Sequence, residues 1–258
     1  MMKVTFLGTG TSQGVPMMGC KCEVCMSKDA HDKRLRSSVL VESGDTVIVI
    51  DSGPDFRYQM LRERVDYLDA ILITHGHKDH VGGLDDVRAY NYILGRPVDV
   101  YGEERVLKIL KKDFDYAFAP ERYPGVPEII LHRIATDKFR IRQLEITPIR
   151  GYHYKLPVLG FRIGPFAYLT DMNRIDLKEQ EKLKGVDTLV INALRREPHI
   201  SHFTLSQALE VIGYVKPRQA YLTHVSHQMG LHKEINKELP ANVAFAYDTL
   251  KIEINQAI

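Results

Sequence analysis

The chain has 258 residues, of which 44% are apolar and 26% charged, and its formal net charge at pH 7 is +2. This near-neutral balance argues against a nucleic-acid partner, and no apolar run is long enough to span a membrane. The opening residues, MMKVTFLGTG, hold too short an apolar run for a signal peptide, so we expect a cytoplasmic protein. The length fits one domain over residues 1–258.

The chain begins with an alternating segment, residues 3–7, that predicts an edge or first strand. The three cysteines follow in a C-x-C-x-x-C pattern within residues 19–26: Cys20, Cys22 and Cys25. An odd number of closely spaced cysteines is no disulfide framework, and metal binding in a reducing compartment explains it better.

Structural zinc takes four ligands, so this zinc knuckle lacks one ligand locally. His31, six residues after the last cysteine, is one candidate. Three reduced thiols without a metal are the alternative. A catalytic cysteine is disfavoured, because no base is paired with it in the sequence.

An apolar hairpin over residues 37–50 ends at Asp51, and a helix is expected from there to about residue 65. Asp51 has two interpretations of equal weight. It either supports the following histidines from outside the metal shell or simply precedes the helix.

The most informative stretch is residues 71–84, ILITHGHKDHVGGL. A short branched apolar run predicts a buried strand, and a crowded polar cluster follows it directly. Neutral imidazoles and carboxylates are good ligands for zinc, manganese or iron. The residues of this cluster are His75, His77, Asp79 and His80.

Further elements follow in a regular order. We expect helices over 83–93 and 103–114 and strands over 97–102, within 139–149 and over 158–164. His153 lies between two of these strands, and Asp171 ends the strand FAYLT. Taken alone, each is an ordinary residue at a strand boundary.

The last part of the chain adds more histidines. Thr204 and Gln207 form a capping box before an amphipathic helix, and His202 lies two residues before the cap. A helix N-terminus attracts anions, so His202 is a candidate proton donor near a phosphate. His199 is either a second phosphate contact or merely exposed. The last predicted strand ends in His224, and His227 follows three residues later.

The order H-x-H-x-D-H after an apolar strand resembles the signature of the metallo-β-lactamase-fold hydrolases. The resemblance implies an α/β fold, a four-layer αββα sandwich, with a two-metal site. Together with the cysteine knuckle, it resembles the PhnP-type branch, the phosphoribosyl cyclic phosphodiesterases. That branch implies that His227 completes a structural zinc site with the three cysteines, in place of His31.

The same resemblance implies two active-site metals, zinc or manganese, bridged by Asp171. One metal would be bound by His75, His77 and His153, and the other by Asp79, His80 and His224. Asp79 would also orient a water, and His202 would donate a proton.

The function implied is hydrolysis of a small, cyclic, sugar-linked phosphodiester by a metal-activated water. A tRNA 3′-end endonuclease is an alternative, disfavoured because the chain shows no basic tRNA-binding arm. A non-catalytic protein that binds a phosphorylated ligand through metals is another. The branch also implies a homodimer.

Overall fold

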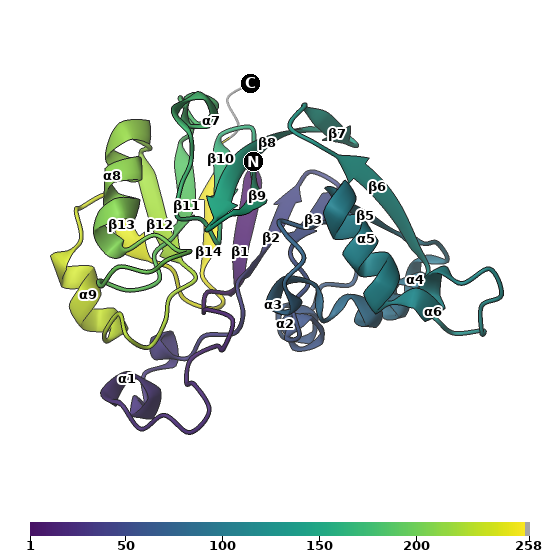
Figure 1. Ribbon diagram of the computed structural model, residues 1–258, viewed down its shortest axis with the longest axis horizontal. Helices are drawn as coiled ribbons and strands as arrows, with labels where there is room; N and C mark the ends of the chain where they lie inside the picture. The colour runs from purple at the N-terminus through teal and green to yellow at the C-terminus, as the bar shows by residue number, and fades with distance from the viewer. Residues whose placement is uncertain (256–258) are drawn as a thin grey trace.

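The computed structural model describes residues 1–255 and contains two β-sheets packed face to face, with helices on both outer surfaces (Figure 1). Within these residues, the first sheet has the strand order β14 (Lys251–Ile254), β1 (Met2–Gly8), β2 (Ser38–Ser43), β3 (Thr46–Ile50), β4 (Ala70–Leu72), β5 (Val98–Glu103) and β6 (Ile129–Ile134). The second has the order β13 (Val243–Phe245), β12 (Gln219–Thr223), β11 (Thr188–Asn192), β10 (Phe166–Leu169), β9 (Leu156–Ile163), β8 (Leu144–His153) and β7 (Phe139–Ile141).

The helices lie mostly in the connections that run over the outside of the sheets (Figure 1). Those of the first half are α1 (Glu23–Met26), η1 (Ala30–Asp32), α2 (Phe56–Glu63), α3 (Lys78–Val81), η2 (Leu84–Val87), α4 (Arg88–Leu94), α5 (Glu104–Asp113) and α6 (Asp115–Phe118). Those of the second half are α7 (Leu177–Glu181), α8 (Leu205–Val215) and α9 (His232–Glu238). None of the helices in residues 1–255 is both long and apolar enough to cross a membrane.

Alternation along the strands produces the layers. Neighbouring strand residues point to opposite faces of a sheet. On β4, Leu72 therefore packs between the sheets, while Ile71 packs beneath α2, α4 and α5. On β10, Tyr168 packs between the sheets and Leu169 packs toward α8. The predicted αββα sandwich is confirmed.

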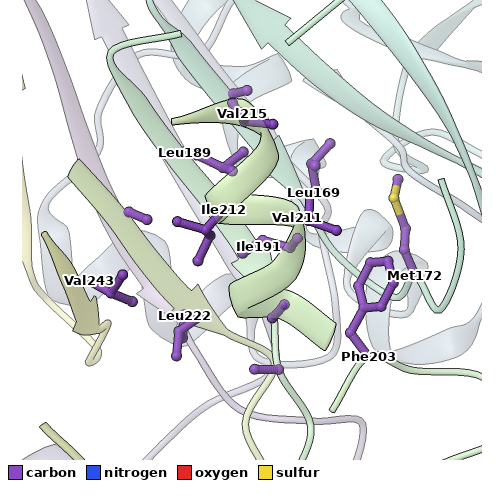
Figure 2. Packing of buried hydrophobic residues seen from close by; sticks show 14 of the residues in the cluster. Leu169, Met172, Leu189, Ile191, Phe203, Val211, Ile212, Val215, Leu222 and Val243 are labelled. Atoms are coloured by element: carbon purple, nitrogen blue, oxygen red, sulfur yellow. The ribbon is translucent and has the colours of Figure 1, made fainter. Parts of the chain in front are cut away.

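A hydrophobic core lies between the second sheet and α8, and it also fixes the loops that carry Asp171 and His202 (Figure 2). Val211 and Ile212 of α8 pack over Leu189 and other residues of the sheet. Each buried aliphatic side chain of this kind stabilises the fold by about 1.5–3 kcal/mol. The capping box predicted at the start of α8 is confirmed.

Met172 and Phe203 lie side by side at the edge of this cluster (Figure 2). The backbone N–H of Phe203 donates to the carbonyl of Met172 at 2.7 Å. Each of the two residues directly follows a candidate site residue, so core packing holds Asp171 and His202 close together. Gly151 leaves room for Met172, because a Cβ at that position would come within 2.3 Å of the Met172 sulfur and displace its side chain.

The strand predicted near the N-terminus as an edge or first strand is the first strand, and it is interior rather than at an edge, because β1 pairs with both β14 and β2. One expectation about strands was wrong. The strand ending at His224 is not the last, since β13 and β14 follow it. The sequence interpretation also missed β6. These strands are short, and their alternation cannot be told from that of a loop without their partners.

Candidate metal centre

The site lies where several strands end at the same edge of the two sheets. Strands β3, β4 and β5 are parallel, as are β10, β11 and β12, so their carboxyl ends lie together. Three residues that follow these strands have a left-handed backbone conformation: Asp51 (φ 66°), Asp171 (φ 57°) and His224 (φ 53°). Left-handed non-glycine residues cluster at functional sites, where the surroundings hold them in place.

The histidine stretch leaves β4 as a short loop and continues into α3, so Asp79 and His80 lie on a helical turn rather than in the loop. The loop is tied to both sheets. The N–H of Leu159 in β9 donates to the carbonyl of Thr74, and the N–H of Ser52 donates to that of His80. Gly53 allows this packing, since a Cβ there would lie 2.0 Å from the carbonyl oxygen of Asp79.

The structure brings all seven predicted metal ligands into one cluster, in which His77 is exposed and the other six are buried or half-buried. His75 Nε2 lies 3.0 Å from His77 Nδ1, and the His77 ring centroid lies 5.1 Å from that of His153. Three groups have ligand atoms within 4.8 Å of one another. These groups are His75, His80 and Asp171; His153, Asp171 and His202; and Asp79, Asp171 and His224. Asp171 belongs to all three, as expected of a bridging ligand.

Two of the ring nitrogens in the cluster lie close to a carboxylate without forming a hydrogen bond in the described part of the chain. Asp171 Oδ2 lies 3.2 Å from His80 Nε2 and 3.1 Å from His224 Nδ1. Yet His80 Nε2 and both ring nitrogens of His224 are buried without a hydrogen-bond partner within residues 1–255. Two ligands bound at about 2.1 Å to one tetrahedral metal lie roughly 3.4 Å apart. The residues therefore fit divalent metals.

Further contacts orient the imidazoles toward such metals. Asp51 accepts from His80 Nδ1 at 2.6 Å and also from the N–H and hydroxyl of Thr74. His153 Nδ1 donates to the carbonyl of Ser201 at 3.0 Å. In both histidines this leaves Nε2 available as a ligand atom. Of the two interpretations of Asp51, the structure supports the one in which it holds the histidine loop.

The electrostatics of the cluster also suit a metal. Burial lowers the pKa of His75 well below its ordinary value and lowers the pKa values of His153 and His224 to about 4, so these rings are neutral at pH 7. Burial acts to raise the pKa of Asp171, but the neighbouring His224 and His80 hold it well below its usual range. Neutral imidazoles and ionised carboxylates are the forms that bind divalent cations. His80 differs: burial acts to lower its pKa, but Asp171, Asp51 and Asp79 hold it well above the ordinary value, so a metal would displace a proton from this ring.

His202 lies against the cluster from the loop before α8. Its Nε2 is 3.2 Å from Asp171 Oδ1, and its Nδ1 is 3.1 Å from His199 Nδ1. This position suits a proton donor, but it also lies within reach of a shared metal with His153 and Asp171. His199 contacts His202 directly, and its predicted phosphate contact stays a prediction.

The structure groups the three cysteines with His227. His227 Nδ1 lies 3.5 Å from Cys20 Sγ and 3.2 Å from Cys22 Sγ, and all four residues offer ligand atoms within 4.8 Å of one another. A tetrahedral zinc would separate its nitrogen and sulfur ligands by about 3.6 Å. The N–H groups of Met17 and Cys25 approach the sulfur atoms of Cys25 and Cys22, as is common around thiolates.

His31, the other candidate for the fourth ligand, lies apart from this group. Its Nδ1 is 2.9 Å from Asp29, and its ring stacks on that of His232. We therefore expect His227→Gln to remove the knuckle zinc and His31→Gln to keep it. If His227→Gln lowers the free energy of unfolding by about 3 kcal/mol, Tm should fall by roughly 6–12 °C, since each kcal/mol shifts Tm by about 2–4 °C in a chain of this size.

Metal content by elemental analysis and thermal unfolding of the two variants measure this difference. His31→Gln serves as the matched control, because it makes the same substitution near the same knuckle. Full zinc occupancy in His227→Gln, or loss of zinc in His31→Gln, would contradict the assignment.

The sequence interpretation missed Asn173 and Ser201. Asn173 Oδ1 accepts from the N–H of Tyr154, and its Nδ2 donates to the carbonyl of Ile200. Ser201 acts through its carbonyl oxygen, which no side-chain pattern reveals. Asn173 follows Asp171 by two residues, and this proximity is the one signal that could have indicated it.

Comparison with known proteins agrees with this geometry. Residues 46–225 match the model of the beta-lactamase superfamily domain. A solved diphosphatase from the PhnP family is 39% identical, with a TM-score of 0.93 and full coverage of both chains. The chain belongs to the PhnP family of the β-lactamase superfamily. The resemblance predicted from the histidine and cysteine patterns is thus confirmed.

Other relatives share the fold or part of the length. An octanoyltransferase of Porphyromonas gingivalis is 43% identical over 99% of this chain, which spans about half (52%) of that relative. A coenzyme PQQ synthesis protein B of Methylobacterium radiotolerans is 31% identical over 41% of this chain and 38% of its own length. Human tRNase Z, short form, is 19% identical with a TM-score of 0.70 over 98% of this chain. This likeness supports the same fold and no shared function.

Proposed function

We propose that this PhnP-family protein is a metal-dependent hydrolase that cleaves a small phosphodiester, with a cyclic sugar phosphate as the preferred substrate. The observation that carries the proposal is the joint approach of His80, His224 and His202 to the single carboxylate of Asp171. The related diphosphatase of the PhnP family supports chemistry at a phosphorus–oxygen bond.

The proposed metal ligands are the seven residues of the cluster around Asp171. Two divalent metals held there, zinc or manganese, would lower the pKa of a bound water toward neutrality and neutralise charge on the phosphate oxygens. Asp79 Oδ2 lies 3.1 Å from His80 Nε2. In the proposal, this carboxylate accepts a hydrogen bond from the attacking water and fixes its direction.

His202 completes the reaction from the other side. Cleavage breaks the bond between phosphorus and the departing oxygen, and a sugar alkoxide is a poor leaving group. His202 Nε2, aimed at the cluster, would donate its proton to that oxygen. The ring of His199, in contact through Nδ1, orients His202 and is proposed as a second contact for the phosphate.

Two alternatives receive less support. A tRNA 3′-end endonuclease would need a basic surface for its substrate, whereas the net charge here is only +2. A non-catalytic protein that binds a phosphorylated ligand would not need a carboxylate and an imidazole placed for proton transfer. We propose a small phosphorylated molecule as the substrate and a homodimer as the functional form.

The test is hydrolysis of bis(p-nitrophenyl) phosphate by protein that has been stripped of its active-site metals and then given manganese or zinc. We expect metal-dependent release of nitrophenolate, and none from p-nitrophenyl phosphate. No release with either metal, from folded protein with its knuckle zinc intact, would contradict the proposal. Octanoyl thioesters would then be the next substrates, because one relative is named an octanoyltransferase.

A further inference from the structure

An open pocket of about 570 Å³ lies beside the metal cluster. His77 and His153 form the side of the pocket that faces the cluster, and the other walls come from two separate segments. These are the tip of the β8–β9 hairpin and the loop that precedes His202. The larger apolar residues of these walls are Tyr154, Leu156, Pro157 and Ile200.

Two of these walls present exposed apolar side chains. Tyr154 is 50% exposed and Ile200 is 65% exposed. Single exposed apolar residues are common and need no explanation. Here, however, they belong to different segments and line the same pocket, next to residues that fit a metal site. Apolar walls beside a few polar groups are typical of ligand pockets.

The two walls are fixed relative to each other. Tyr154 has a φ of 57°, a conformation that is unfavourable for a residue with a side chain. Its N–H donates to Asn173 Oδ1 at 2.8 Å, and Asn173 Nδ2 donates to the carbonyl of Ile200 at 3.0 Å. One amide side chain thus joins the hairpin tip to the opposite loop. Lys155 Nζ lies over the Tyr154 ring, 5.4 Å from its centroid.

We propose that this pocket binds a flat, largely apolar ring, such as a nucleobase or an aryl group, on the part of the substrate that stays attached to phosphorus. The inference rests on the proposed phosphodiesterase function. The position of the proton donor indicates which part of the substrate occupies the pocket, because His77 and His153 line the pocket and His202 does not. In the in-line reaction of an open-chain diester the leaving group departs toward the proton donor, so the pocket is left to the retained group. In a cyclic sugar phosphate the sugar stays attached to phosphorus through its second oxygen, so a ring on that sugar is retained as well.

Contact between the ring and these walls is the same before and during bond cleavage. Such uniform binding lowers KM and leaves kcat nearly unchanged. A substrate that carries the ring should therefore differ from one without it mainly in KM. Stacking and apolar contact of one ring typically change affinity by about tenfold or more.

The experiment compares thymidine 5′-(p-nitrophenyl phosphate) with methyl p-nitrophenyl phosphate. Both have the same leaving group and charge, and they differ only in the retained ester. We expect kcat/KM to favour the thymidine ester by about tenfold or more, through KM. Ile200→Ser and Tyr154→Asn should reduce that preference to about twofold or less, while Tyr154→Phe should keep it. Asparagine is chosen because it tolerates the left-handed backbone of Tyr154.

Two matched controls make the same substitutions outside the pocket. Tyr123 is 81% exposed and Ile130 is 46% exposed, and neither lines the pocket. Tyr123→Asn and Ile130→Ser should therefore keep the full preference. Equal metal-dependent turnover of both esters, or a preference unchanged in the Ile200 and Tyr154 variants, would overturn this inference alone. No turnover of any nitrophenyl diester would overturn the proposed function and this inference together.

Discussion

Asp171→Asn should lower turnover of a phosphodiester by at least about 10³-fold and release the active-site metals, while the knuckle zinc stays bound. The carboxylate lies within 3.2 Å of ring nitrogens of His80, His202 and His224. Removing a residue that contacts a metal ligand typically lowers metal affinity or activity by about 10–100-fold. Removing a ligand that both proposed metals share should lower them further. An asparagine keeps the shape of the side chain but removes the charge that, in our proposal, holds two cations together.

Metal content and initial rates at saturating manganese measure this effect. Asp187→Asn is the matched control, because Asp187 precedes a strand but pairs with Arg218 outside the site. The control should keep its metals and its rate. An Asp171→Asn protein that retained both active-site metals and more than a tenth of the rate would refute the bridging role.

His202→Ala should separate substrates by their leaving groups. General acid catalysis is worth about 10²–10⁴-fold, so turnover of a sugar or alkyl diester should fall by that factor. Turnover of a nitrophenyl ester should fall by less than about tenfold, because nitrophenolate leaves without a proton. The metal content should not change, since in our proposal His202 is not a ligand.

His132→Ala provides the control, because that half-exposed histidine is bound to Asp99 away from the site. Equal losses on both substrates would reject proton donation by His202. If metals were lost as well, His202 would be a ligand, a role that its grouping with His153 and Asp171 permits.

Local spacing in the sequence was enough to predict much of the site. The four candidate ligands His75, His77, Asp79 and His80 indicated a metal site because so many ligand types follow one buried strand. The knuckle cysteines likewise indicated a second site by their spacing. His153, Asp171 and His224 were different, because each alone is an ordinary residue at a strand boundary. Only the family resemblance made them predicted ligands.

The sequence by itself determined the two groups of ligands that are close in the chain, and the resemblance that these groups carry implied the family and the layers of the fold. Periodicity and short spacing are local properties, and local sequence specifies them. Only the tertiary structure decided that Asp51 orients His80 and that Asn173 joins the walls of a pocket. It also places His227 rather than His31 with the cysteines, as the family resemblance had implied. Those contacts join segments far apart in the chain, and packing of the two sheets brings them together.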